Sequence, residues 1–217
     1  MLEKLKSLFG RKPPATIGDM EYSRFQALKT AGLENVLGKM YDRVHHAVIP
    51  FVAGGAVDVY FFPNAVPGTG LATMELIRPD GRGPKPTRAG VYELVAFTKY
   101  KIGDAFEEEA FAKIKNHLWR IFTLLGNYGK EAVLNPFDTI EIPAEEGFPA
   151  SCLILTELKP EGKEFRIGRR KFALLLVIEV FRSEMEYAMR EGTQNLLVRL
   201  QEKGHYPYSD LDREPVR

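Results

Sequence analysis

Ten consecutive residues, FALLLVIEVF at 172–181, constrain the fold more than any other segment of the chain. Glu179 is the single charged residue among them, and charged residues bound the run on both sides. An apolar run of this length, without alternating polar residues, is typical of a strand whose two faces are both buried. We therefore predict that 172–181 forms the central strand of a sheet that is covered on each face.

Other segments rich in β-branched and aromatic residues predict the remaining strands. The first three follow one another closely, so an antiparallel meander is their simplest topology. The Gly- and Pro-rich loop at 63–70 lacks the G-x-G-x-x-G pattern and joins two expected strands. We therefore interpret it as a turn rather than a phosphate-binding loop. Pro136 favours an edge position for its strand. The expected strands are 56–63, 71–78, 91–99, 133–142 and 149–158.

Apolar residues spaced three and four apart predict helices around this sheet. In the first part of the chain, a helix capped by Asp19 should end at Gly32. A second helix over 33–48 has the clearest apolar stripe of this region and should stop before Pro50.

Two further patterns predict helices in the second half of the chain. A long helix capped by Asp104 should end at Gly126 and Gly129. Ser183 and Glu186 form a capping-box pattern directly after the central strand, and a final helix follows.

The composition is that of one globular domain. The chain has 217 residues, of which 45% are hydrophobic and 27% are charged. Without repeats or a linker, these elements predict a single α+β domain with a mixed, mostly antiparallel sheet flanked by helices. We assign this domain to residues 17–204. Residues 1–16 would be an N-terminal extension, either a short helix or disordered, and 205–217 a poorly packed polar C-terminal tail.

Charge and cysteine content restrict the location and the partners. The net charge is +1, from 30 Lys and Arg against 29 Asp and Glu, so we expect no nucleic-acid partner. The single cysteine, Cys152, cannot form an internal disulfide. No apolar run is long enough to span a membrane, and the N-terminus lacks the features of a secretory signal. We therefore expect a cytoplasmic protein without membrane association.

Motifs of known catalytic chemistry, such as G-x-S-x-G and H-E-x-x-H, are absent from the sequence. On the predicted helix over 33–48, Asp42 and His46 lie one turn apart, with His45 beside them. Two ligands make an incomplete metal site, so we predict no metal and no cofactor. An uncharacterised hydrolase or metal-binding enzyme using these three residues is kept as the alternative function. The basic cluster at 166–171 leaves nucleic-acid binding as a third hypothesis.

Six segments, in chain order, resemble the Suppressor of fused domain. They are VDVYFFP, ATMELIRP, YELVAFTK, LWRIFTLLGNYGKEAVLNPFDTIEIP, FPASCLILTEL and FALLLVIEVFRSEMEYAMREGTQNLLVRL. The last is the most specific match, because a hydrophobic strand runs into a helix of the type E-x-E-Y-A. The resemblance covers about residues 33–203 and rests on the ordered series. The chain departs from the family at 72–76, where Ala-Thr-Met-Glu-Leu replaces a Thr-Ser-Gly-Met element.

This resemblance implies a mixed α/β fold and a non-enzymatic, protein-binding function. In animals, members of the family bind a zinc-finger transcription factor of the Hedgehog pathway with the help of a second domain. This chain is too short to carry that domain, so we do not transfer that partner. Bacterial stand-alone members include immunity proteins that neutralise polymorphic toxins. We therefore expect a bacterial immunity protein whose partner is another protein, with a toxin domain as the specific hypothesis.

For the partner-binding surface we select Tyr60, Phe62, Arg78, Asp80 and Arg82, near the first two expected strands. Aromatic and arginine side chains are common anchors of protein interfaces, so removal of the aromatic pair should weaken binding most. A partner could add a strand to an exposed sheet edge or fill a groove between the sheet and the helices.

Overall fold

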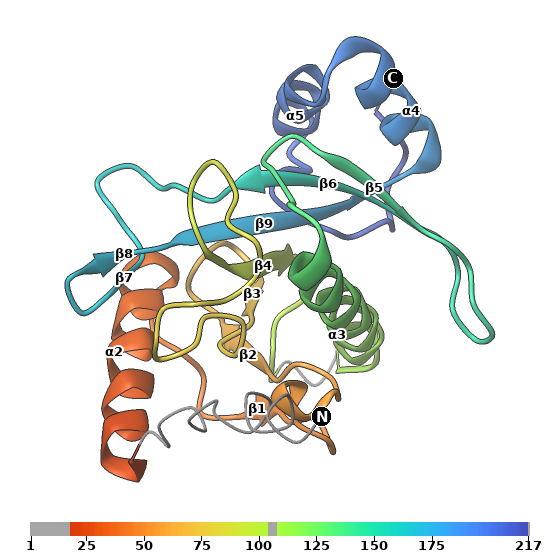
Figure 1. The fold of residues 1–217 in the computed structure, drawn as a ribbon. Coiled ribbons are helices and arrows are strands. Elements are labelled where there is room, and N and C mark those ends of the chain that lie inside the picture. Colours follow the sequence, from red (N-terminus) through yellow and green to blue (C-terminus); the bar gives the residue numbers. More distant parts are fainter. Residues whose placement is uncertain (1–17, 104–107, 217) are drawn as a thin grey trace, which may run out of the picture.

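The computed structural model describes residues 18–103 and 108–216, and a seven-stranded sheet forms its middle layer (Figure 1). Its strands are β1 (Val44–His45), β2 (Val59–Phe62), β3 (Thr69–Ala72), β4 (Tyr92–Thr98), β5 (Thr139–Ile142), β6 (Ser151–Glu157) and β9 (Ala173–Val180). Their order in the sheet is β1-β2-β3-β4-β9-β6-β5. Strands β4 and β9 are parallel, and the other neighbours are antiparallel. The predicted α+β domain with a mixed, mostly antiparallel sheet is confirmed.

Strand β9 is the central buried strand that the run at 172–181 predicts. It lies between β4 and β6, and each of its residues is buried. Leu174 and Leu176 pack into the core on one face of the sheet, whereas Leu175 and Val177 pack into the core on the other. The two-residue period of a strand therefore distributes one apolar run between two cores.

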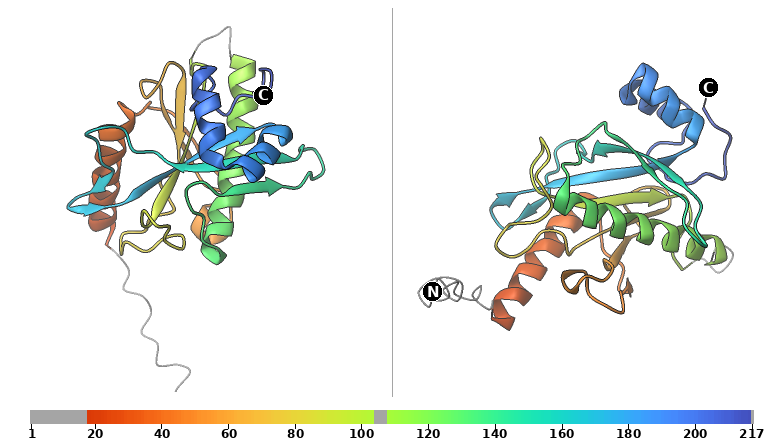
Figure 2. Two further views of the ribbon diagram at one scale, coloured as in Figure 1. Left: turned by 90° about the horizontal axis from the view of Figure 1, so that it is seen from above. Right: turned by 45° about the vertical axis from the view of Figure 1, so that its right-hand side comes forward.

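Helices cover both faces of the sheet (Figures 1 and 2). Helix α3 (Glu108–Glu131) and the short 3-10 helix η1 (Phe51–Ala53) pack on one face. Helices α2 (Asp19–Leu37), α4 (Arg182–Glu191) and α5 (Thr193–Glu202) pack on the opposite face. Two short strands, β7 (Arg166–Ile167) and β8 (Arg170–Lys171), form a separate hairpin beside α2. None of the helices in the described residues combines the length and apolarity needed to cross a membrane.

The Gly- and Pro-rich loop at 63–70 is a turn, as predicted. It joins the adjacent antiparallel strands β2 and β3, with Phe62 opposite Gly70. Gly68 has a φ of +136°, and a Cβ there would lie 2.1 Å from the carbonyl oxygen of Thr98. A side chain at position 68 would therefore prevent the turn from closing against β4.

The N-terminal helices differ from the prediction. Helix α2 is continuous through Gly32 and ends at Gly38, whose φ is +84°, so the expected helix over 33–48 is wrong beyond residue 37. A Cβ at Gly32 would lie 2.0 Å from the carbonyl oxygen of Arg166. This glycine therefore permits close packing of β7 against the helix, and it does not end the helix.

Helix α3 also continues where an end was predicted. Gly126 and Gly129 lie inside it and are buried. A Cβ at Gly129 would lie 2.5 Å from the hydroxyl oxygen of Tyr92, so the absence of a side chain lets β4 approach the helix. The proposed cap at Asp104 falls outside the described residues.

The C-terminal segment packs against the domain, so the expected weak packing of the tail is wrong for 205–216. Asp210 is buried and accepts hydrogen bonds from the Thr98 hydroxyl (2.5 Å) and the Lys99 N–H (2.8 Å). Arg213 forms a buried ion pair with Glu184 at 2.7 Å. The same carboxylate accepts the N–H of the residue preceding α4, so Glu184 provides the capping contact that the sequence assigned to Glu186.

Candidate functional site

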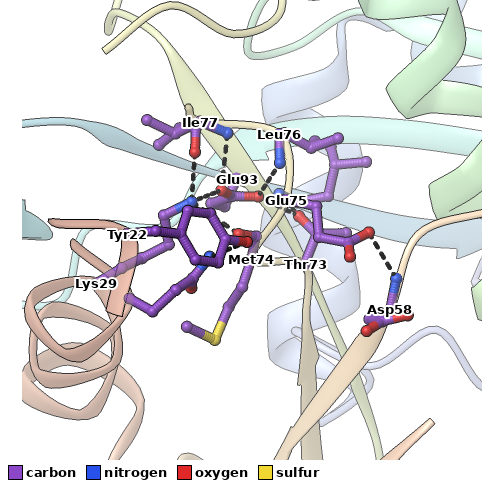
Figure 3. Close-up of polar contacts among 11 residues, drawn as sticks. Tyr22, Lys29, Asp58, Thr73, Met74, Glu75, Leu76, Ile77 and Glu93 are labelled. Atoms are coloured by element: carbon purple, nitrogen blue, oxygen red, sulfur yellow. Dashed lines mark hydrogen bonds and ion pairs between the residues drawn. The ribbon is translucent and has the colours of Figure 1, made fainter. Parts of the chain in front are cut away.

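The site is built on a buried carboxylate in β4. Glu93 is fully buried and accepts hydrogen bonds from the Thr73 hydroxyl (2.6 Å) and from the N–H groups of Leu76 (3.2 Å) and Ile77 (2.9 Å) (Figure 3). The N–H groups of Leu76 and Ile77 thus bond to a side chain and not to a neighbouring strand. The segment consequently leaves the sheet after β3, and the strand predicted over 71–78 is wrong beyond position 72.

Lys29 of α2 balances the charge of Glu93. Its Nζ lies 2.9 Å from Glu93 Oε1 and also donates to the carbonyl oxygens of Met74 (2.7 Å) and Ile77 (2.5 Å). All three ammonium hydrogens therefore have acceptors, although the side chain is fully buried. Loss of either charge would leave the other buried and uncompensated. The loop at 73–77 is thus fixed between α2 and β4.

Glu75, in the same loop, is directed away from this ion pair toward Asp58 (Figure 3). It accepts the Asp58 N–H at 3.0 Å, and burial raises the pKa of Glu75, although this hydrogen bond opposes the shift. The Asp58 carboxylate bonds to His46 Nδ1 (2.7 Å) and to the N–H of Ala47 (2.8 Å). Burial, followed by the charges of Asp58 and Glu75, raises the pKa of Tyr60. The outer side of the loop is therefore also held by specific contacts.

A pocket of about 260 Å³ lies between this loop, η1 and α3. Its floor contains Phe51 and Leu76, which are buried. A Cβ at Gly126 would lie 3.1 Å from atoms of both side chains, so glycine allows them to pack on α3. We call this the η1 pocket. It is lined by Phe51, Val52, Glu75, Leu76, Arg78, Gly83, Pro84, Gly126 and Lys130.

Positively charged side chains surround the η1 pocket. Arg78 reaches one carboxylate, that of Asp80, at 3.8 Å. Lys130 donates to the Asn127 side chain (2.8 Å), and Lys85 donates to the last main-chain carbonyl of α3. Within the described residues, neither lysine forms an ion pair. The charge of Lys130 is therefore not neutralised by a described side chain, whereas that of Arg78 is paired with Asp80.

Exposed apolar side chains continue from the pocket along the preceding loop. Val48, Ile49 and Val52 are 100%, 57% and 79% exposed, and Val52 also lines the η1 pocket. Exposed apolar side chains gathered on a surface beside an arginine are typical of polypeptide-binding sites. This surface can hold an apolar side chain and attract negative charge.

The five residues selected from the sequence do not form one surface. Arg78, Asp80 and Arg82 lie in one exposed turn, where Arg82 donates to Asp80 through its N–H (2.9 Å) and its Nε (2.5 Å). Tyr60 is half-buried in β2. Phe62 is fully buried in the core that α2 covers, so it is not available to a partner.

The family model of the Suppressor of fused protein (SUFU) matches residues 70–214. The chain belongs to the SUFU family. The match supports the resemblance found in the sequence, although its bounds differ from 33–203. It includes Glu93 and the cations at the rim of the η1 pocket, and it begins after Phe51 and Val52. No curated protein matches the chain.

This SUFU domain does not assemble the enzyme site considered from the sequence. Residues 38–50 are not helical, so Asp42 and His46 are not one helical turn apart. His46 pairs with Asp58, whereas His45 packs edge-on against the Trp119 ring, with centroids 4.7 Å apart. Burial lowers the pKa of His45. Within the described residues, no group of three or more His, Cys, Asp and Glu side chains could hold a metal ion.

A serine, a histidine and a glutamate do meet at the other end of the SUFU domain. His117 Nε2 lies 2.8 Å from both carboxylate oxygens of Glu179 and 3.3 Å from Ser151 Oγ. In a catalytic triad, the acid and the nucleophile bond to opposite ring nitrogens of the histidine. Here both contact the same nitrogen, so this arrangement does not relay a proton. It provides a polar partner for a carboxylate buried in the central strand.

The basic cluster at 166–171 is largely occupied by contacts within the domain. Arg166 and Lys171 both bond to the Glu164 carboxylate, at 2.6 Å each. The Arg170 guanidinium lies 5.2 Å from the centroid of the Phe172 ring. These contacts give the cluster a structural role in the β7–β8 hairpin.

Proposed function

We propose that this chain is a non-catalytic protein-binding domain, and that it acts as a bacterial immunity protein against a polymorphic toxin. Membership in the SUFU family carries the first part, because SUFU domains bind proteins and are generally non-catalytic. The η1 pocket supports it, since a cavity lined by both apolar and basic side chains, with the exposed Val52 at its edge, suits a polypeptide. The immunity role is an extension of this binding function to one class of partner.

The surface proposed for the partner includes the exposed turn with Arg78, Asp80 and Arg82. The accessible part of Tyr60, which packs on the α2 side of the sheet, would be a separate contact. Arg78 connects this turn to the η1 pocket. Its neighbour Asp80 orders the turn through bonds to Arg82 and by accepting, at its carbonyl, a hydrogen bond from Arg170 (3.4 Å). The binding surface is therefore rigid before the partner arrives, which lowers the entropic cost of association.

Affinity purification of the tagged chain from its native cells, at low and at high salt, tests this function. A stoichiometric protein that co-purifies at low salt, whether or not it is retained at high salt, is the expected result. If that protein alone arrests growth, and co-expression of this chain restores growth, the immunity role is supported. Growth arrest that persists despite a stable complex would contradict the immunity role alone. The absence of any stoichiometric protein at either salt concentration would contradict the binding function.

A further inference from the structure

The size of the η1 pocket indicates what it can accept. Its volume is about 260 Å³. Small-molecule sites are usually larger, at about 300–1,000 Å³. Phe51 and Leu76 are held in the wall of the η1 pocket, because they pack on α3 at Gly126 and the adjoining loop is anchored through Glu93. The apolar side chain of the lining that a partner can reach is Val52, which is 79% exposed. Such a cavity suits one apolar side chain that a larger partner inserts, in the manner of an interface anchor.

The charges around the cavity indicate which residues should lie beside that side chain in the partner. Lys130 lies over the Phe51 ring, 3.8 Å from its centroid, and Arg78 lines the same pocket. Asp80 is bonded more closely to Arg82 (2.5 Å) than to Arg78 (3.8 Å). Glu75 is the one acidic side chain in the pocket lining, and it is half-buried. An incoming carboxylate would therefore meet cations with little competition from this chain.

We infer that the partner binds the η1 pocket through an acidic segment that carries a large apolar side chain. This inference rests on the proposed protein-binding function and names the partner's chemistry. The apolar side chain enters the pocket against Val52, and flanking Asp or Glu side chains meet Arg78 and Lys130. Val52, at the edge of the pocket, extends the apolar contact. Charge complementarity of this kind accelerates association and makes binding sensitive to salt.

A library of random 12-residue peptides displayed on phage tests the inference with the full chain as the target. We expect enriched peptides with net negative charge and a central Leu, Ile, Phe, Met or Trp. Synthetic versions of the enriched peptides should bind the chain less tightly as the salt concentration rises. Enrichment of neutral or basic peptides, or no enrichment, would overturn the inference.

Two charge-removing variants locate the site. Arg78→Ser combined with Lys130→Ser should weaken binding of the selected peptides by about tenfold or more. The matched control, Lys163→Ser combined with Lys203→Ser, removes two exposed cations outside the pocket and should change binding by less than about twofold. Equal binding by the two variants would place the peptides elsewhere and overturn the inference.

The same variants separate this inference from the proposed function. A native partner that binds Arg78→Ser/Lys130→Ser as tightly as the unchanged chain would leave protein binding intact and overturn the assignment of the pocket. Circular dichroism and thermal unfolding identical to those of the unchanged chain would confirm that any loss of binding reflects the surface. Val52→Asp offers a second probe, because a new carboxylate at the pocket edge should repel the acidic segment. This variant should weaken binding of the selected peptides severalfold.

Discussion

Replacing Lys29 with methionine removes the positive charge from the buried ion pair while keeping most of its aliphatic length. The change leaves the Glu93 carboxylate buried without a countercharge, and it leaves the carbonyl oxygens of Met74 and Ile77 without their donor. Removal of one partner from a buried pair costs about 3–5 kcal/mol of unfolding free energy. In a domain of this size each kcal/mol lowers Tm by about 2–4 °C, so Tm should fall by about 6–20 °C.

Urea unfolding measures this loss, with the fluorescence of the single tryptophan, Trp119, as the probe. Arg24→Met is the matched control, because Arg24 is exposed on the same helix and its removal should change stability by less than about 0.5 kcal/mol. Adding Glu93→Gln to Lys29→Met neutralises the orphaned carboxylate. The double variant should then lose less stability than the sum of the two single variants, by about 0.5–3 kcal/mol.

A loss below about 1 kcal/mol for Lys29→Met would refute this reasoning, because it would mean that water or a rearranged loop compensates the buried charge. Additive effects of the two substitutions would refute it as well. The ion pair also anchors the wall of the η1 pocket through Leu76. Folded Lys29→Met protein should therefore bind the selected acidic peptides more weakly, although Lys29 itself touches no partner.

Three further perturbations test separate parts of the structure. Glu75→Gln keeps the acceptor for the Asp58 N–H and removes a charge whose pKa burial raises. Because the folded-state pKa lies above 4.5, the unchanged chain gains stability as the pH falls through that raised pKa toward 4.5. The variant should therefore be more stable near neutral pH, by roughly 0.5 kcal/mol or less, and urea midpoints of the two proteins should converge at acid pH. Gly129→Ala should destabilise by about 1–3 kcal/mol through the clash with the Tyr92 hydroxyl. Tyr92→Phe should rescue it, since that hydroxyl has no hydrogen-bond partner among residues 18–103 and 108–216, and thermal unfolding that shows no rescue would contradict the clash. Truncation after Gly204 should cost about 3 kcal/mol or more, because it removes the Arg213–Glu184 ion pair and the bonds of Asp210 to Thr98 and Lys99, and a Tm equal to that of the full chain would contradict this.

The sequence predicted those elements whose signal is local. The run at 172–181 has a composition that only a strand buried on both faces satisfies, and β9 is that strand. The turn at 63–70 was predicted because its glycines and prolines join two strand patterns. Both predictions depend on short stretches whose physical requirement is visible in the stretch itself.

The glycines were misinterpreted for a physical reason. The sequence predicts helix ends at Gly32, Gly126 and Gly129, because glycine is common there. In the structure they lie within helices at points where another segment approaches closely. The neighbours, Arg166 and Tyr92 among them, are distant in sequence. A single sequence does not indicate which role a glycine has.

The η1 pocket could be predicted in part. Arg78 was selected from the sequence, and it lines the pocket. The sequence does not point to Phe51 and Val52, because the apolar spacing at 33–48 predicts a helix that ends just before them. It does not point to Lys130, because that residue follows the helix end predicted at Gly129. Lys29 gave no signal either, since a lysine in a helix usually lies in solvent. Its burial depends on the distant Glu93, so the support of the site is a tertiary property.

The position of β9 has a consequence for synthesis of the protein. The meander of β2, β3 and β4 is complete once residue 98 has been made, but the partner of β4 on its other edge is β9, whose first residue is Ala173. During translation the apolar edge of β4 therefore remains without its final neighbour while the ribosome adds α3, β5 and β6. Unpaired strand edges of this kind favour aggregation of nascent chains. Slow elongation or crowding of ribosomes on the message should accordingly lower the yield of folded protein more than it would for a chain whose central strand is made first.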